Sequence, residues 1–332
     1  MNGEGFTTTV FPQSIGIAST WNPRLVSQEA EVISDEARAL SNQLNNAKFL
    51  NFWSPMINMA RDPRWGRTQE SYGEDPFLVS EISKAFIQGL QGNDPKYIKT
   101  AASIKHFIAN NVDYHRHYGS SNISEKLLRD YYFPAFKANV LESNVQIVMS
   151  AYNSLNNVPC SSNEWLLQEV LRDDWGFDGH VVSDCGAIYN IHANHFYVDS
   201  PEEGAATAVL AGTDLNCGGM YTTHLAKSVE LGLLPEKDLD KAVIRIITTA
   251  MRLGMYDPKD QIPFSQITSD VIEQNSHQEL AKEVALQSLV LLKNKDNLLP
   301  LSKKLASIAV IGPNANQCIY GNYSGMPSKG IS

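Results

Sequence analysis

Short apolar runs alternate along the chain with longer amphipathic stretches. Runs of strand length lie at 14–20, 50–58, 101–109, 145–153, 179–185 and 213–217. Apolar residues with the spacing of a helix face predict helices over 27–43, 76–90, 124–141, 163–175, 201–211 and 222–231. Asp75 followed by Pro76 is typical of a helix start, because it places a capping side chain before proline at the first helical position. This alternation of strand and helix favours βα units around a parallel sheet.

The number of units favours a closed barrel over an open sheet. Six units are complete by about residue 220, and no G-x-G-x-x-G motif follows the first apolar run. Helical spacing continues over 239–253 and 275–291. We therefore predict an α/β fold with a (β/α)8 TIM-like barrel, whose active site would lie at the carboxyl ends of the strands.

A change of composition near residue 290 predicts a domain boundary. The stretch "KNKDNLLPLSKK" (293–304) breaks the helical pattern, and "SIAVIGPNA" (307–315) then resembles the first strand and turn of a new α/β domain. We expect a barrel domain over 1–290 that lacks its first strand, a linker over 291–305 and the truncated start of an α/β sandwich domain over 306–332.

Charge and composition exclude several classes of function. The chain has 332 residues, of which 43% are hydrophobic and 19% charged, and its formal net charge is −9. Binding to nucleic acid requires a concentrated basic face, and the chain has no run of Lys and Arg. No stretch approaches the roughly 18 apolar residues of a membrane helix. Nucleic acid and membrane are therefore not expected partners, and the sequence predicts no oligomeric state.

Neither the N-terminal residues nor the cysteine pattern identifies the cellular compartment. Residues 1–12 contain no basic segment followed by an apolar one, as a signal peptide would. They run directly into structured sequence, so we expect the natural N-terminus to lie upstream. The four cysteines, Cys160, Cys185, Cys217 and Cys318, form no C-x-x-C pair typical of a zinc site.

Polar residues that end apolar runs are the candidates for chemistry, because these positions gather at one mouth of a barrel. They are Arg61, Arg67, Lys105, His106, Met149, Tyr152, Asp184, Asp214 and Cys217. Cations, a phenol and carboxylates at one mouth suit a neutral polyhydroxylated ligand that is held by many hydrogen bonds around one reactive carboxylate. Asp184 in "VVSDCGAI" could alternatively be a turn residue, since Asp before a Gly is common in turns.

A series of ordered motifs resembles the family 3 glycoside hydrolases over essentially the whole chain. The motifs include "NMARDPRWGRTQESYGEDP", "IKHFIANN", "VMSAYNSLNNVPCSSN", "GFDGHVVSDCGAI", "AGTDLNCG" and "LVLLKNKDNLLPL" before "IAVIGPNA". The resemblance implies that Asp184 is the catalytic nucleophile of a retaining glycosidase. It also implies that the acid/base Glu belongs to the second domain and lies outside this sequence, and that no metal or cofactor takes part.

The resemblance further implies a subsite for the non-reducing terminal sugar, lined by Arg67, Lys105, His106, Met149 and Tyr152. Neighbouring cations such as Arg67 and Lys105 would favour the charged form of Asp184. Adjacent residues of a regular strand face opposite ways, so Lys105 and His106 can both reach the sugar only where the backbone is irregular. A non-proline cis peptide is one such irregularity. Arg61 is expected to be structural and to pair with Asp62 or Glu70.

The motif "DYHRH" allows other interpretations. His115 and His117 could bind a metal, as in a TIM-barrel metalloenzyme, or act in acid/base catalysis as in the N-acetylglucosaminidase branch of the family. That branch carries "KHFPGHG", whereas this chain has "IANN" after its "KHF". We therefore expect both histidines to be loop residues near the site.

Cysteine directly after the nucleophile favours the β-xylosidase branch, since many β-glucosidases of the family have Trp there. Cys185 and Cys217 follow successive apolar runs, which places them on neighbouring strand ends, where they could form a disulfide. They would form a wall beside C5 of the sugar, where glucose but not xylose carries a CH₂OH group.

The predicted activity is thus that of an exo-acting retaining β-glycosidase, specifically a β-D-xylosidase on xylo-oligosaccharides in xylan degradation. β-Glucosidase activity and a side activity on α-L-arabinofuranosides are the alternatives within the class. A sugar-binding protein without catalysis is the alternative outside it, since the sequence shows no acid/base residue. By resemblance, a periplasmic or extracellular location is favoured.

Overall fold

A parallel sheet forms the centre of the molecule. The computed structural model describes residues 6–321 and 323–330. Four parallel strands, in the order β1-β2-β4-β7, comprise Asn51–Phe52, Ala101–Phe107, Ile147–Ser150 and His180–Ser183. A single parallel bridge from Val182 to Leu215 continues the series. Each strand thus lies beside the next one along the chain, as in the predicted barrel.

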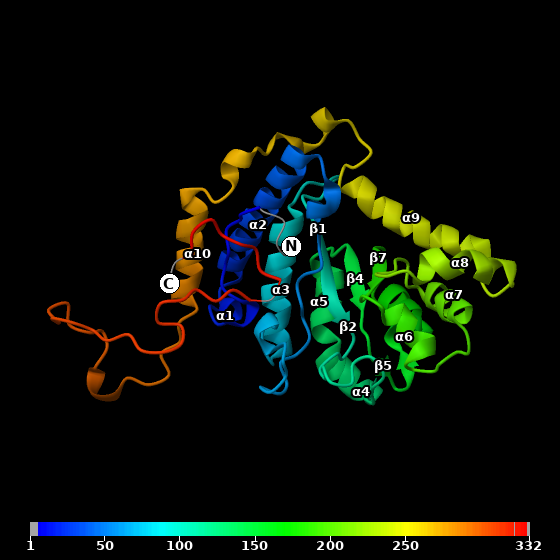
Figure 1. Cartoon of the computed structure of the whole chain (residues 1–332), viewed down its shortest axis with the longest axis horizontal. Helices are drawn as coiled ribbons and strands as arrows, with labels where there is room; N and C mark the ends of the chain where they lie inside the picture. The colour runs from blue at the N-terminus through cyan, green and yellow to red at the C-terminus, as the bar shows by residue number, and fades with distance from the viewer. Residues whose placement is uncertain (1–5, 322, 331–332) are drawn as a thin grey trace.

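Helices lie on either side of the sheet, and the last helix packs on the first two helices rather than on the sheet (Figure 1). Those before β7 are α1 (Ser14–Ala18), α2 (Pro23–Leu44), α3 (Pro76–Gln91), α4 (Glu125–Leu127) and α5 (Pro134–Glu142). Those after β7 are α6 (Ala187–Ala193), α7 (Pro201–Ala211), α8 (Met220–Glu230), α9 (Glu236–Arg252) and α10 (Asn275–Gln287). Asp75 caps α3 as predicted, because its Oδ1 accepts a 2.7 Å hydrogen bond from the Leu78 amide.

Two predicted strands are wrong. Residues 14–20 contain helix α1, in which the amides of Gly16 and Ile17 bond to the Gln13 carbonyl and Ile17 is buried. Residues 307–315 form no strand, and no described strand lies beside them to pair with their main chain. A strand is stable only with a partner.

Two predicted helices have irregular geometry. The helix predicted over 124–141 is divided into α4, a π-helical turn at Leu128–Tyr132 and α5, with Pro134 at the start of the last. The helix predicted over 163–175 is a π-helix at Trp165–Asp174.

Alternate side chains of the strands enter two different apolar layers. Ile104, Val148 and Val181 pack outward against the helices, in a cluster that includes Phe136 and Leu167. Ala101, Ile147, Met149 and Val182 pack inward together with Leu253. This division follows from the two-residue period of a strand, and it leaves the strand ends free to carry polar residues.

A small second sheet crosses the carboxyl edge of the first. Its strands β3 (Ser120–Ser121), β5 (Ser154–Leu155) and β6 (Val158–Pro159) lie in the order β3-β5-β6. The sheet joins the segment that follows β2 to the segment that follows β4. Both segments carry candidate residues.

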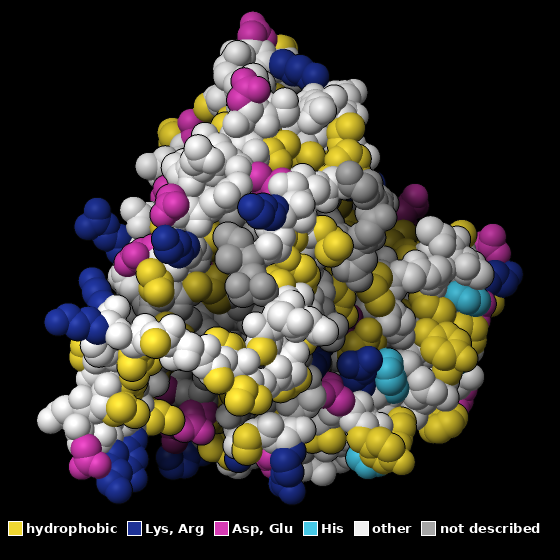
Figure 2. Space-filling view, turned by 60° about the vertical axis from the view of Figure 1, so that its left-hand side comes forward, with side chains coloured by type: hydrophobic (Ala, Val, Ile, Leu, Met, Phe, Trp, Pro, Cys, Tyr) yellow, Lys and Arg dark blue, Asp and Glu magenta, His cyan; other side chains and the backbone are white. Residues whose placement is uncertain are grey.

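The C-terminal segment folds back along the N-terminal part of the chain (Figure 1). The Thr8 amide donates to the Met326 carbonyl at 2.9 Å, and the Ser328 amide donates to Glu273 Oε1 at 2.6 Å. The face shown in Figure 2 carries scattered charges of both signs. Within residues 6–321 and 323–330, no helix combines the length and apolarity that a membrane span needs.

Candidate active site

Asp184 lies at the carboxyl edge of the sheet, immediately after β7. Its amide donates to the Ser150 carbonyl of β4 at 3.1 Å, and its Oδ1 accepts a 2.7 Å hydrogen bond from the Cys185 amide. The residue is only 9% exposed. The carboxylate is therefore held by main-chain contacts at the end of two neighbouring strands.

Strand β2 is irregular at Lys105 and His106, as predicted. Its register against β4 shifts between Ile104 and Phe107, and the Lys105–His106 peptide is cis, as is Phe107–Ile108. His106 Nε2 lies 3.4 Å from Asp184 Oδ2, so this side chain is inside the candidate site. Lys105 lies close enough to lower the pKa of Asp184.

His106 is a neutral imidazole. Burial lowers its pKa well below the usual range, and the charges of Lys105, Arg67 and Arg116 lower it further. Its Nδ1 contacts Asn58 Oδ1 at 3.0 Å and its Nε2 contacts Arg67 Nη1 at 3.1 Å. Arginine can only donate, so Nε2 accepts and Nδ1 carries the proton. The contact with Asp184 is consequently not an ion pair.

Arg67 is held in place by Glu70. Its Nε donates to Glu70 Oε1 at 2.8 Å and its Nη2 to Glu70 Oε2 at 2.6 Å, which leaves Nη1 to His106. A two-point contact of this kind fixes both the position and the plane of a guanidinium. Arg67 therefore presents a fixed cation beside Asp184 rather than a mobile surface charge.

Burial has the largest effect on the pKa of Asp184. The pKa of its carboxyl is raised above the usual range, with burial as the largest cause. The Cys185 amide, a hydrogen bond from Tyr152 and the charges of Lys105 and Arg67 act in the opposite direction and lower that pKa. The predicted effect of the cations is present, but it does not outweigh burial.

Tyr152 and Lys105 also titrate away from their usual ranges. Burial, followed by the charge of Asp184, raises the pKa of Tyr152 well above its usual range, so its hydroxyl stays protonated and can donate. Burial and the nearby Arg67 lower the pKa of Lys105 to about 8. The Lys105 Nζ also lies 5.4 Å from the ring centroid of Tyr323, which comes from the far end of the chain.

Cys185 and Cys217 form a disulfide beside Asp184. Their sulfurs are 2.01 Å apart and their Cα atoms 4.4 Å apart. The Gly186 amide donates to the Cys217 carbonyl at 2.8 Å, which joins the same two loops again. The predicted proximity of these two strand ends is confirmed.

Other candidates lie apart from this group. Met149 is buried in the inner apolar layer, and its contact with a sugar stays a prediction. Asp214 accepts hydrogen bonds from Arg172 at 2.8 Å and from Arg245 at 2.9 Å, which is a structural arrangement. The predicted partners of Arg61 are wrong: it bonds to the Tyr132 hydroxyl, because Asp62 pairs with Arg64 and Glu70 with Arg67.

The two histidines of "DYHRH" do not converge. His115 Nδ1 contacts the Tyr118 hydroxyl at 2.7 Å, whereas the His117 ring lies against Tyr152. The described part of the chain contains no group of three or more His, Cys, Asp or Glu side chains that could hold a metal ion.

Sequence reasoning missed Asn58, Glu70 and Arg116 as members of this site. Asn58 ends an apolar run and Glu70 lies three residues after Arg67, so position alone gave a signal for both. Arg116 gave none, because it follows no strand directly and reaches the site through the fold of its loop.

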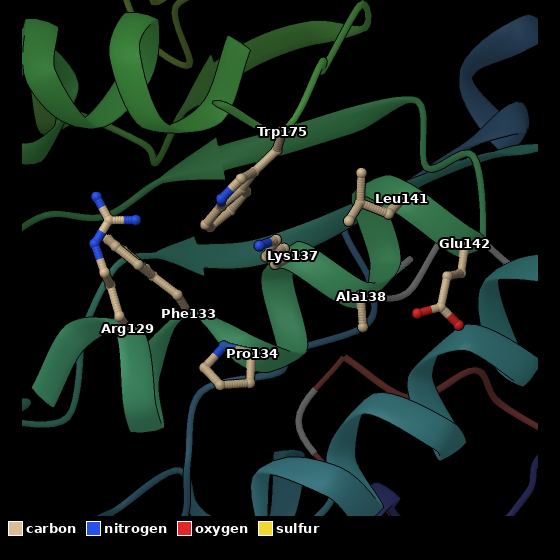
Figure 3. A pocket seen from close by; sticks show the side chains of 8 residues that line it. All are labelled: Arg129, Phe133, Pro134, Lys137, Ala138, Leu141, Glu142 and Trp175. Atoms are coloured by element: carbon tan, nitrogen blue, oxygen red, sulfur yellow. The ribbon is translucent and has the colours of Figure 1, made fainter. Parts of the chain in front are cut away.

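A separate groove of about 410 Å³ lies on the helical side of the sheet (Figure 3). Phe133 and Trp175 line it together with the charged side chains of Arg129, Lys137 and Glu142. It shares no residue with the group around Asp184.

Comparisons with known proteins cover nearly the whole chain. Residues 2–249 match the Glycosyl hydrolase family 3 N terminal domain and residues 289–331 match the family's C-terminal domain. A Xylan 1,4-beta-xylosidase from Xylanibacter ruminicola is 40% identical over 98% of this chain and 39% of the relative. A Beta-xylosidase/alpha-L-arabinofuranosidase 2 from Medicago sativa is 40% identical over 97% of this chain and 43% of the relative.

Solved structures of similar sequence have a similar fold. A GH3 exo-beta-xylosidase (XlnD), in complex with a xylobiose aziridine probe, has a TM-score of 0.93 and 36% identity over 99% of this chain and 43% of that chain. A beta-glucosidase from Listeria innocua in complex with glucose has a TM-score of 0.80 and 34% identity over 90% of this chain and 40% of that chain. The chain spans about two fifths of the length of these relatives.

Proposed function

The chain belongs to glycosyl hydrolase family 3, whose N-terminal domain is a (β/α)8 barrel, and from this we propose that it forms most of the catalytic barrel of an exo-acting retaining β-glycosidase. The observation that carries the proposal is the position of Asp184. One buried carboxylate lies at the carboxyl edge of the sheet, with Arg67, Lys105, His106 and Tyr152 around it.

In the proposed first step, Asp184 attacks the anomeric carbon of the terminal sugar. The glycosidic bond breaks, and the leaving oxygen takes a proton from an acid residue, which we expect from the second domain beyond this sequence. The product is a glycosyl ester of Asp184. Water then attacks the same carbon and gives a proton to the same residue, which now acts as the base. The ester bond to Asp184 breaks, and the sugar leaves with its original configuration.

The groups around Asp184 suit sugar hydroxyls. Arg67 and protonated Lys105 can donate hydrogen bonds, whereas the Asp184 carboxylate can accept one from a hydroxyl that donates. A neutral polyol needs this mixture of donors and acceptors. The fixed position of Arg67 on Glu70 favours one orientation of the bound ring.

We propose terminal β-linked xylose of xylo-oligosaccharides as the substrate. The Cys185–Cys217 disulfide lies directly beside Asp184, where it would narrow the space that glucose needs for its CH₂OH group. The xylosidase names of the sequence relatives support the same choice. Glucoside hydrolysis is the alternative that the β-glucosidase neighbours favour, and the Medicago relative favours a side activity on arabinofuranosides.

The disulfide also supports an oxidising compartment, since such bonds are rare in reducing cytosol. We therefore propose a periplasmic or extracellular location.

The test is turnover by the complete gene product that carries this chain. We expect hydrolysis of an aryl β-xyloside with a higher kcat/KM than of the matched aryl β-glucoside. The first sugar released should be the β-anomer by NMR. Release of the α-anomer would overturn the retaining mechanism. Tight xylose binding without turnover would favour a sugar-binding protein.

A further inference from the structure

The loop 113–117, which contains the "DYHRH" motif, packs on Tyr152. The Arg116 guanidinium carbon lies 5.1 Å from the centroid of the Tyr152 ring. The His117 ring lies 4.6 Å from the same ring at an interplanar angle of 61°. A cation over one face and an aromatic edge are both favourable contacts for a phenol ring. The phenol is thus held by two side chains from a different strand end.

The two side chains are themselves fixed. Arg116 Nη1 lies 3.6 Å from Asp113 Oδ1, and His117 Nδ1 lies 3.1 Å from Asn190 Nδ2 on α6. The loop that follows β2 is therefore connected to the helix that follows β7, across the segment that carries Tyr152.

His195 fixes the main chain around Tyr152. His195 Nε2 lies 2.9 Å from the Tyr152 carbonyl oxygen, and His195 Nδ1 lies 3.0 Å from the Ser154 hydroxyl. With both its backbone and its ring held, the phenol has little freedom. Its hydroxyl is hydrogen-bonded to Asp184.

We propose that Arg116 is a positioning residue for the nucleophile, which it serves by stacking on Tyr152 and keeping the Tyr152 hydroxyl on the Asp184 carboxylate. This inference rests on the proposed function. The planar guanidinium suits this role better than an ammonium group, because it can stack on the ring. Arg116 acts through Tyr152 and needs no contact with the sugar.

The role predicts a change in the ionisation of Asp184. The titratable and charged groups that act on Asp184 are Arg67, Lys105, His106, Tyr152 and His117. Arg116 and Tyr323 act on Tyr152. Loss of the Tyr152 hydrogen bond removes one of the contacts that favour the carboxylate. The pKa of Asp184 then rises, and the acid limb of the kcat/KM profile moves to higher pH.

The experiment is a double-mutant cycle in the complete gene product with an aryl β-xyloside. We expect Arg116→Ala to lower kcat about tenfold with KM changed less than threefold, and to move the acid limb upward. Arg116→Lys should restore part of the loss. In a Tyr152→Phe background, Arg116→Ala should cost less than twofold, because the hydroxyl on which Arg116 acts is absent.

Arg64→Ala is the matched control, since Arg64 is an exposed arginine of a neighbouring loop that pairs with Asp62. The kcat of Arg64→Ala should stay within twofold of that of the parent. If Arg116→Ala lowers kcat by the same factor in the Tyr152→Phe background as in the parent, the inference is overturned. It is also overturned if the acid limb of the kcat/KM profile does not move in Arg116→Ala. Asp184→Ala separates the two proposals: full activity in that variant would overturn the proposed function itself.

Discussion

Asn58 binds both the main chain and the ring of His106. Its Nδ2 donates to the His106 carbonyl at 2.9 Å, and its Oδ1 accepts from the His106 amide at 2.8 Å and lies 3.0 Å from the ring Nδ1. One amide side chain therefore sets both the backbone path at the end of β2 and the tautomer of the imidazole that faces Asp184.

Replacement of Asn58 should impair catalysis through His106. Asn58→Ala leaves the buried amide and Nδ1 proton of His106 without an acceptor, and each such group costs about 1–3 kcal/mol. We expect kcat/KM on an aryl β-xyloside to fall at least about tenfold. Asn51→Ala, at an exposed position of β1, is the control and should leave kcat/KM unchanged. Equal activity of the two variants would contradict the role of Asn58.

Lys105 should set an alkaline limit to activity. Its pKa is lowered to about 8, so the ammonium loses its proton as the pH rises through that value. The loss removes the positive charge that strengthens hydrogen bonds from Lys105 and that favours the Asp184 carboxylate. We expect kcat/KM to decline above about pH 8. Lys105→Arg should be less active but should retain its activity to higher pH, because arginine stays charged. An alkaline limb that is identical in the two proteins would assign the limit to another group.

The disulfide should affect sugar preference far more than the chemical step. Replacing Cys185 and Cys217 with Ala, singly and together, reshapes the wall beside Asp184. The kcat/KM ratio of matched xyloside and glucoside should change by the equivalent of about 1–3 kcal/mol, which is typical of a steric pocket contact. Cys318→Ala, at an exposed free cysteine, should leave the ratio unchanged. An unchanged ratio in all three disulfide variants would show that specificity is set elsewhere.

Glu29 should make the stability of the fold depend on pH. This side chain is buried on α2, and its Oε2 has no hydrogen-bond partner among the described residues. Burial raises its pKa well above the reference of 4.5, so the folded state retains a proton that the unfolded state releases. The stability that this proton contributes is fully present below the pKa of Glu29 in the unfolded state. It is lost as the pH rises through the pKa of Glu29 in the folded state.

Glu29→Gln removes this titration. Its unfolding free energy, measured by denaturant titration of the chain, should exceed that of the parent by about 1 kcal/mol or more at pH 8 and by less at pH 5. Glu31→Gln, on the exposed face of the same helix, is the control. A difference that is independent of pH would contradict this account.

The sequence predicted the parts of the fold that local pattern controls. Helix α7 has the predicted bounds, and α3 begins at the predicted Pro76, because proline and capping residues mark these starts. Residues 14–20 were predicted wrongly because a short apolar run suits either a strand or a helix, and only tertiary packing decides between them.

The candidate site was predictable where a residue lies at or just after the carboxyl end of an apolar run. Asp184 directly follows β7, and Lys105 and His106 lie within the last three residues of β2. The two disulfide cysteines come shortly after β7 and after the bridge at Leu215. Asn58 ends a predicted apolar run, but its hydrogen bonds to His106 depend on the irregular path of β2, which the sequence pattern does not encode. Arg116 reaches Tyr152 through the fold of a long loop, and no periodicity encodes that contact.

The most direct test of the account is the Asp184→Ala variant of the complete gene product, assayed with an aryl β-xyloside and with azide. We expect nearly all hydrolysis to be lost and azide to restore cleavage in part. The product should then be the α-xylosyl azide, because the small anion attacks from the face that Asp184 occupied. Asp178→Ala, at an exposed carboxylate just before β7, should keep full activity. Retained hydrolysis in the Asp184→Ala variant would contradict the assignment of Asp184 as the nucleophile.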